Sequence, residues 1–395
     1  MSRSPRTPAP LAHPVLALAL ALLTDGPARA GSPDPAGRPV PAAHPLAAAA
    51  TGTPLGSGTG LHPRAVRLAA SGSANGRILA SVVSFEGGNG VGLVHESADN
   101  GASFRQVGRI ADPESAGGQG LCCSTLFELP RQVGALPPGT LLRASSAGQG
   151  EAGRRTALRI WRSNDTGRSW SYLSSCAVAG TTGGLWEPEF SVAADGALVC
   201  HYADETDPAH SQKLAAARSH DGVTWRDHRS TVASARFEDR PGMPVVRRLP
   251  GGSFLMSYEI CGPGGPYRCA VYLRSSADGW NRGDPRVLGG RPETVDGRHL
   301  RAAPTLARAP SPDGSRFLEI ATDWSGPDCR PYAATGSAAG TGDAAGVADG
   351  AAYRLVNANS GHCLDVAGDG REAGADVRQW TCNGLQPQLW ILQRP

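Results

Sequence analysis

Short runs of apolar or alternating apolar and polar residues, separated by Gly, Pro, Asp and Asn, dominate residues 60–332. No part of this region shows the three-to-four-residue apolar spacing of a long helix. Runs of this kind, bounded by turn residues, are typical of β-strands joined by tight turns. The region is therefore predicted to be all-β. The runs fall at 77–84, 140–145, 156–161, 196–202, 253–260 and 270–274.

One turn sequence recurs within this region. It reads SADNGASF at 97–104 and SNDTGRSW at 163–170, with a shortened form at 219–225 and degenerate copies at 276–280 and 311–317. Successive aspartates are 66, 56, 57 and 35 residues apart. Ser and Asp side chains can hydrogen bond nearby backbone amides, and Gly accepts a positive φ. The copies resemble the Asp-box, or bacterial neuraminidase repeat, of sialidase-like β-propellers. The resemblance implies six blades, with five as the alternative, and aspartates that are structural rather than catalytic.

The N-terminal residues differ in composition from the rest of the chain. Residues 1–30 combine a basic start, an apolar run from Leu16 to Leu23 and an A-x-A-like sequence at 28–30, which is the pattern of a secretory signal. Residues 31–59, rich in Ala, Pro and Gly, are predicted to be a flexible lead-in. We therefore expect a secreted, extracellular protein with no membrane partner. The formal net charge of +3 argues against nucleic-acid binding, and nothing in the sequence indicates an oligomeric state.

Nine cysteines would then lie in an oxidising compartment. Cys261 and Cys269 flank a turn-rich stretch and are predicted to form a disulfide across it. No metal site is predicted, because the chain has no CxxC pair and two adjacent cysteines suit tetrahedral zinc poorly. The pairing of five others is left open: Cys122, Cys123, Cys176, Cys200 and Cys329.

Carboxylates near the ends of apolar runs are the candidate catalytic groups. Glu187 and Glu189 stand beside Trp186, and Glu259 follows Tyr258 at the end of the run 253–260. A carboxylate in such a run is costly to bury unless it has a partner or a function. The remaining candidates for substrate binding in the propeller are Arg64, Glu86, Asp204 and Arg240.

Three segments together resemble glycoside hydrolase family 93, the exo-acting 1,5-α-L-arabinanases: 186–189 (WEPE), 240–244 (RPGMP) and 258–259 (YE). The resemblance implies retaining hydrolysis of a polysaccharide or oligosaccharide, and that chemistry requires no cofactor. It assigns Glu187 as general acid/base and Glu259 as nucleophile.

Physical reasoning agrees with that assignment of roles. The acid needs a raised pKa, which apolar neighbours can supply, and the nucleophile needs a charge partner, for which Arg240 is a candidate. Glu189 is the alternative to Glu187 as the acid.

Two other functions fit the same region. An exo-α-sialidase needs three arginines that converge on the substrate carboxylate, and only Arg64, after Pro63, suggests such a motif. A secreted propeller that binds glycans without cleaving them is the alternative outside enzymes.

The C-terminal residues form a separate predicted module. Residues 333–352, mostly Ala, Gly, Thr and Asp, are predicted to be a linker. Residues 353–395 resemble a single repeat of a ricin-B-type β-trefoil lectin, or carbohydrate-binding module family 13, and end in Gln388-Leu389-Trp390. A β-trefoil has three such repeats, so the module is a partial one. The resemblance implies sugar contacts by Asp365, Trp380 and Asn383, and Cys363 and Cys382 are predicted to pair.

Overall fold

A computed structural model describes residues 55, 58–150, 153–264, 267–292, 300–308, 316–323 and 330–337 and four short C-terminal strands, with side chains up to residue 307. All of these residues belong to the unit Thr51–Pro395. The predicted secretory signal and most of the lead-in lie outside the described residues, as do Cys329, Cys382 and Asn383. Among the described residues, no helix has the length and apolar character needed to span a bilayer.

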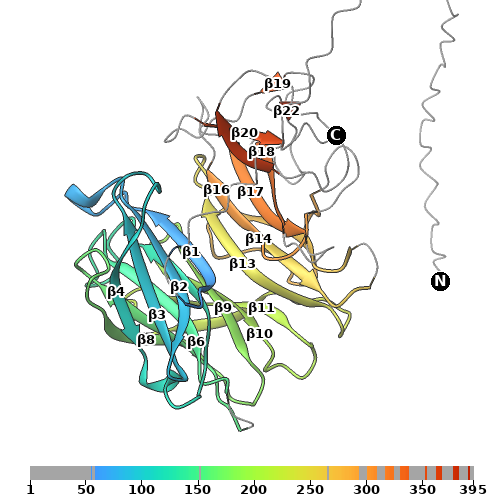
Figure 1. The fold of residues 1–395 in the computed structure, drawn as a ribbon. Coiled ribbons are helices and arrows are strands. Elements are labelled where there is room, and N and C mark those ends of the chain that lie inside the picture. The colour runs from blue at the N-terminus through green and yellow to red at the C-terminus, as the bar shows by residue number, and fades with distance from the viewer. Residues whose placement is uncertain are drawn as a thin grey trace, which may run out of the picture. The chain divides into compact units, whose positions relative to one another are not determined.

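The chain forms successive antiparallel sheets in which neighbours in sequence pair with one another (Figure 1). The first three sheets have four strands each. Sheet one contains β1 (Leu61–Arg67), β2 (Ile78–Glu86), β3 (Asn89–Ser97) and β4 (Arg105–Ala111). Sheet two contains β5 (Leu121–Glu128), β6 (Leu141–Ala147), β7 (Ala157–Ser163) and β8 (Ser171–Val178). Sheet three contains β9 (Leu185–Val192), β10 (Leu198–Asp204), β11 (Lys213–Ser219) and β12 (Arg226–Val232).

Two further sheets have three strands each among the described residues. Sheet four contains β13 (Arg240–Arg248), β14 (Phe254–Cys261) and β15 (Ala270–Ser276). Sheet five contains β16 (Thr305–Arg308), β17 (Arg316–Asp323) and β18 (Arg330–Ser337). The two described helices are short 3-10 turns, η1 (Gly72–Ala74) and η2 (Pro113–Ser115).

The first strands of consecutive sheets lie against one another. β1 contacts β5, β5 contacts β9, β9 contacts β13, and β13 contacts β16. Apolar clusters then fill the space between neighbouring sheets, as where Phe190 of β9 packs with Leu142 of β6. Middle strands such as β10 are buried on both faces along their whole length, so even the polar residues His201 and Asp204 are buried there. This confirms the predicted all-β class and its propeller-like arrangement, while the count of six blades stays a prediction.

The copies of the recurring turn that the structure describes share one hydrogen-bond pattern, while most of the copy at 311–317 lies outside the described residues. In the turn after β7, the Ser163 hydroxyl accepts the Gly167 N–H at 2.9 Å, and the Asp165 carboxylate accepts the N–H groups of Arg168 and Ser169. Equivalent bonds join Ser219, Asp221 and Gly222 in the turn after β11. These aspartates therefore hold turns between outer strands, and none of them lines the cavity described below.

The structure contains three disulfides among the described cysteines. The predicted Cys261–Cys269 pair is present. Cys176 of β8 is joined to Cys200 of β10, and Cys122 is joined to its neighbour Cys123.

The C-terminal boundary differs in detail from the prediction. β18 pairs with β17 through Ser337, so the fifth sheet extends beyond residue 332 into the predicted linker. Small Ala, Gly and Thr side chains do not prevent strand pairing when a partner strand is available. Beyond it, β19 (Ala352–Tyr353) pairs with β22 (Trp390–Ile391), and β20 (His362–Val366) pairs with β21 (Val377–Thr381).

Candidate active site

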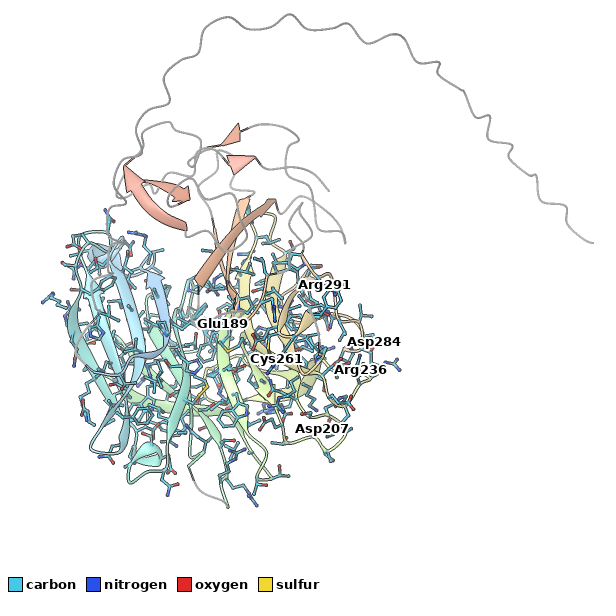
Figure 2. The ribbon with its side chains drawn as sticks, turned by 45° about the vertical axis from the view of Figure 1, so that its right-hand side comes forward. Glu189, Asp207, Arg236, Cys261, Asp284 and Arg291 are labelled. Carbon is cyan, nitrogen blue, oxygen red and sulfur yellow. A yellow bond between two sulfur atoms is a disulfide. The ribbon has the colours of Figure 1, made fainter. Side chains whose placement is uncertain are left out.

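A cavity of about 1100 Å³ lies among the first strands of the sheets. Its lining comes mainly from β1, β5, β9 and β13 and from Ala303 and residues 305–307, with Pro130, Arg131 and Phe254 completing it. Glu189, labelled in Figure 2, contributes to it from β9.

In each of sheets one to four, the first strand is interrupted near its start by a β-bulge. The ladders shift register at His62 in β1, Cys123 in β5, Glu187 in β9 and Met243 in β13. The φ angles of these residues are 47°, 59°, 59° and 54°, in the left-handed region that L-residues seldom adopt. Ala303, just before β16, has a φ of 44°. Because all five lie at the starts of adjacent first strands, they mark one end of the cavity, here called the bulged end; bulges commonly re-aim side chains next to active sites.

Glu187 projects from the bulge of β9, and its carboxylate accepts the backbone N–H of Met243. Burial, with a smaller contribution from the negative charge of Glu259, raises the pKa of Glu187 to about 7. The N–H of Met243 and the positive charges of Arg64 and Arg240 oppose this rise. A carboxyl group with this pKa still holds its proton for much of the time near neutrality, as a general acid must.

Glu259 lies on β14 opposite Gly242 and is half-buried. Its carboxylate accepts the backbone N–H of Ala303 at 2.7 Å. Burial raises the pKa of Glu259, and the Ala303 N–H opposes that rise. Gly242 is next to both glutamates, because Glu259 is its strand partner and a Cβ added at Gly242 would be 3.1 Å from Oε2 of Glu187. The absence of a side chain at Gly242 leaves room for the carboxylate of Glu187 and the amide of Gln212.

Glu189, the alternative acid, has different surroundings from Glu187. It is 2 % exposed, forms an ion pair with Arg247 and accepts a hydrogen bond of 3.0 Å from the Thr125 hydroxyl. Arg247 also donates to the carbonyl of Leu306 at 3.0 Å. Glu189 therefore links the first strands of sheets two, three and four. These surroundings suit a structural carboxylate better than a proton donor.

A second group of polar side chains surrounds Glu205, next to the bulged end. Arg240 forms an ion pair with Glu205 and donates to Gln212 at 2.7 Å. Trp186 is half-buried, and the guanidinium of Arg154 lies 5.3 Å from the centre of its ring. The ion-pair partner of Arg240 is thus Glu205. The sequence-based candidate for this partner, Glu259, does not pair with Arg240. The charge of Arg240 nevertheless acts on Glu187.

Glu187, Glu259, Trp186 and Arg240 lie at or next to the bulged end without being among the residues that line the cavity. Three other predicted substrate-binding residues are also outside the lining, and each is held by contacts elsewhere. Tyr258 is fully buried, stacks on Tyr272 and donates its hydroxyl proton to the Leu288 carbonyl, so it is a core residue. Its side chain leaves the opposite face of the strand from Glu259, as alternation requires. Glu86 is in an exposed ion pair with Arg109, at 2.6 Å. Asp204 accepts hydrogen bonds from the backbone and hydroxyl of Thr206, so it holds its own loop.

Sequence reasoning did not identify several residues at this site. Met243 and Ala303 act through backbone N–H groups, which leave no signature in the side-chain sequence. Arg247 becomes recognisable only when sheets three and four are placed together. Arg64, the one predicted arginine that lines the cavity, was recognised from its position after Pro63.

Two groups of residues have donor atoms close enough together to suggest a metal site among the described side chains: His62 with Cys122 and Cys123, and Glu259 with Cys261 and Cys269. In each group the two sulfurs are bonded to each other. Bonded sulfurs are not thiolates, which are the form that binds zinc. Neither group fits a metal in this oxidised state.

Comparison with solved structures identifies arabinan-degrading enzymes as relatives in shape. The α-L-arabinanase of Penicillium chrysogenum, solved with arabinobiose, superposes with a TM-score of 0.58 at 27% sequence identity, covering 70% of this chain and 77% of that one. The family 93 α-L-arabinofuranosidase of Fusarium graminearum, also solved with arabinobiose, gives 0.58 at 25% identity, covering 72% and 79%. The arabinofuranosidase Arb93A from the same organism, with an iminosugar inhibitor, gives 0.56 at 25% identity, covering 66% and 74%.

The propeller thus resembles those of glycoside hydrolase family 93. This confirms the resemblance that the WEPE, RPGMP and YE segments had indicated. No curated protein matches the chain.

The C-terminal residues match a second family. Residues 344–395 match the model for the ricin-type β-trefoil lectin domain-like family. In the described backbone, Asp365 lies on β20 opposite Arg378 of β21, and Trp380 lies on β21 opposite Cys363. The predicted sugar contact at Asn383 and the Cys363–Cys382 pair involve residues outside the described ones.

Proposed function

We propose that this protein is a retaining glycoside hydrolase that cleaves arabinan, most specifically linear 1,5-α-L-arabinan, in the exo mode. The main support is the pair of glutamates at the bulged end of the cavity. Glu187 has a carboxyl pKa of about 7 and lies close enough to Glu259 to respond to its charge. The resemblance to arabinan-degrading propellers of family 93 supports the choice of substrate.

In the first step, Glu187 donates its proton to the glycosidic oxygen while the carboxylate of Glu259 attacks the anomeric carbon. The bond between that carbon and the leaving oxygen breaks, and a covalent ester to Glu259 forms. In the second step, Glu187 removes a proton from water, the water oxygen attacks the same carbon, and Glu259 is released. Two inversions give net retention, and enzymes of this type hold the carboxyl groups about 5–5.5 Å apart.

The surroundings of each glutamate support this division of roles. Met243 donates one backbone N–H to Glu187, which forms no ion pair among the described residues, so the protonated form stays accessible. Ala303 donates to Glu259 and helps to hold it in one orientation. The C-terminal module is proposed to bind the polysaccharide and keep it near the catalytic site. Export is supported by the signal pattern and by the three disulfides.

Product analysis on linear 1,5-α-L-arabinan tests the proposal. The wild-type protein is expected to release a short arabino-oligosaccharide, and NMR should show that the product first appears with the α configuration of the substrate. Glu259→Ala should abolish release. Glu96→Gln is the matched control, because Glu96 is a buried carboxylate whose partners are Arg77 just before β2, Arg105 at the start of β4 and Arg168 in the turn after β7.

Each other outcome identifies a different function. A sialylated glycan is assayed in parallel. Release of sialic acid from it would show that the protein is a sialidase rather than an arabinanase. A folded protein that binds polysaccharide and releases nothing from either substrate would instead be a glycan-binding propeller.

A further inference from the structure

Cys122 and Cys123 form a disulfide between adjacent residues in the bulge of β5. Cys123 is 5 % exposed, whereas Cys122 is half-buried and keeps part of its surface accessible. The bond closes an eight-membered ring that includes the peptide unit between the two residues. The result is a small, rigid and largely apolar surface, fixed directly to the backbone.

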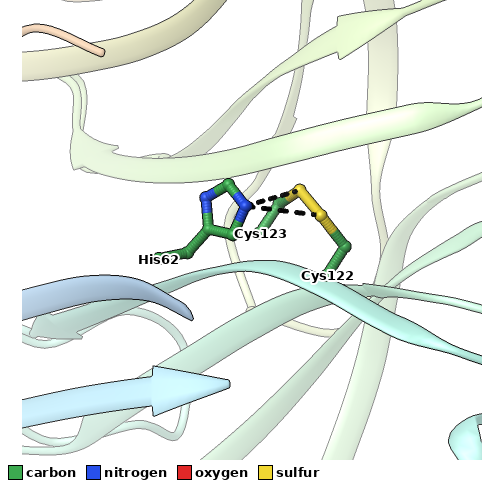
Figure 3. A group of neighbouring side chains, drawn as sticks. All are labelled: His62, Cys122 and Cys123. Atoms are coloured by element: carbon green, nitrogen blue, oxygen red, sulfur yellow. Dashed lines mark hydrogen bonds between the residues drawn. A yellow bond between two sulfur atoms is a disulfide. The ribbon is translucent and has the colours of Figure 1, made fainter. Parts of the chain in front are cut away.

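His62, in the bulge of the neighbouring strand β1, faces this disulfide (Figure 3). Its Nε2 lies 3.7 Å from each of the two sulfur atoms. A bonded sulfur has no proton, so the imidazole N–H donates in this contact. Burial and the positive charge of Arg64 lower the pKa of His62 and favour the neutral ring. With Nε2 protonated, Nδ1 is left as a hydrogen-bond acceptor.

This group lies at the same bulged end as the proposed catalytic glutamate Glu187. His62 lies in the bulge of β1 and the disulfide in the bulge of β5. β1 contacts β5, and β5 contacts β9, whose bulge contains Glu187. The charge of Arg64 acts on both His62 and Glu187, so the two residues are close to one guanidinium. His62 lines the cavity, whereas the two cysteines, like Glu187, belong to the bulged end without lining the cavity itself.

This arrangement suits one face of a sugar ring. Sugars present C–H groups on their faces and hydroxyl groups at their edges, so a sugar site combines an apolar surface with a few directed polar groups. The disulfide supplies a polarisable apolar surface that donates no hydrogen bond, as thioether sulfur does elsewhere. The imidazole supplies an acceptor for a hydroxyl group.

We propose that the Cys122–Cys123 disulfide and His62 form the wall against which the sugar next to Glu187 packs, with His62 accepting a hydrogen bond from one of its hydroxyl groups. The inference rests on the proposed function for the identity of the sugar. The wall binds substrate and transition state alike, so its loss should raise KM much more than it lowers kcat.

The test measures binding separately from catalysis. Arabinobiose is titrated calorimetrically into a Glu259→Gln protein, with and without the further changes Cys122→Ala and Cys123→Ala. We expect Kd to rise about tenfold when the disulfide is removed, and to rise similarly for His62→Ala. The matched control is Cys176→Ala with Cys200→Ala, which removes the disulfide between β8 and β10 and should lower Tm while leaving Kd unchanged. Melting curves establish that each variant is folded.

The outcomes separate this inference from the proposed function. An unchanged Kd in folded proteins lacking the disulfide or His62 overturns the wall, even if the wild-type enzyme cleaves arabinan. The wild-type protein could also bind arabinobiose with a Kd that depends on the disulfide and yet cleave no substrate. That result supports the wall and contradicts the proposed hydrolase activity. If wild-type protein binds no arabinobiose, the wall is overturned as a site for this sugar. Should the double alanine variant fail to fold, His62→Ala alone decides the question.

Discussion

The carboxylate of Glu187 accepts a hydrogen bond from the backbone N–H of Met243, and both residues have left-handed backbone conformations in bulges of neighbouring sheets. The contact therefore joins two interruptions of regular β-structure. It holds the proposed acid of sheet three from the first strand of sheet four. The neighbouring residue, Gly242, has the proposed nucleophile as its strand partner.

Replacing Gly242 by alanine is expected to lower kcat by about 100-fold or more, because a displacement near 1 Å in a catalytic site has an effect of this size. The added Cβ would lie 2.9 Å from Nε2 of Gln212 and 3.1 Å from Oε2 of Glu187. The control is Gly251→Ala in the turn between the same strands, where a Cβ meets nothing within 4 Å. Steady-state kinetics on arabinan should find this control close to wild type. Equal activity of the two variants would mean that Gly242 does not set the position of the acid.

The pH dependence of activity should follow the two glutamates. Activity falls as pH rises through about 7, because Glu187 loses the proton that it must donate. Activity also falls in acid, at a pH above that of an ordinary glutamate, because Glu259 must be ionised and burial raises its pKa. The measurement is kcat/KM against pH on arabino-oligosaccharides.

Glu187→Gln provides the control for that profile. On an aryl arabinofuranoside whose leaving group needs no protonation, this variant should keep the acid limb and lose the alkaline one. An alkaline limb that persists in Glu187→Gln would assign it to another group.

Tyr258→Phe distinguishes a core residue from a substrate-binding one. The change removes a hydroxyl that donates to the Leu288 carbonyl in the interior, so unfolding free energy should fall by about 1 kcal/mol. KM should stay at the wild-type value because Tyr258 is fully buried and its side chain lies on the opposite face of β14 from Glu259. Urea titration and substrate saturation curves measure the two effects. A several-fold rise in KM without loss of stability would return Tyr258 to the binding site.

Glu96→Gln should affect stability and leave catalysis alone. The Glu96 carboxylate is buried and pairs with Arg77, Arg105 and Arg168 at 3.1, 2.8 and 3.2 Å. These arginines are partly exposed and stay hydrated when the charge is removed, so we expect a loss of about 1–2 kcal/mol. Urea unfolding gives the loss, and kcat on arabinan gives the comparison. A large fall in kcat at full stability would show that the distant network acts on the catalytic site.

The all-β class was predictable because strand periodicity and turn chemistry are local properties of the chain. The opposite orientation of Tyr258 and Glu259 also followed from strand alternation alone. Glu187 and Glu189 show where that reasoning ends. In a regular strand they would share one face, but the bulge of β9 gives them different surroundings. The bulge depends on pairing with β10, and no local pattern in the sequence indicates it.

The cysteines show the same division. Cys261 and Cys269 flank one turn, and their pairing was predictable from that placement. The bond between Cys122 and Cys123 depends on the unusual backbone of the bulge, and the bond between Cys176 and Cys200 depends on how β8 and β10 pack. Arg240 was expected to pair with Glu259, yet the loop after β10 brings Glu205 to it instead.

Both proposed catalytic carboxylates are held by amide groups from the next segment along the propeller, Glu187 by Met243 and Glu259 by Ala303. The side chains of these two donors take no part in the contacts. Evolution could therefore exchange methionine or alanine here for other residues that tolerate left-handed backbone, such as glycine or asparagine, and keep the enzyme intact. Relatives with the same catalytic arrangement would then differ at both positions, and a search for invariant residues would pass over the groups that orient the acid and the nucleophile.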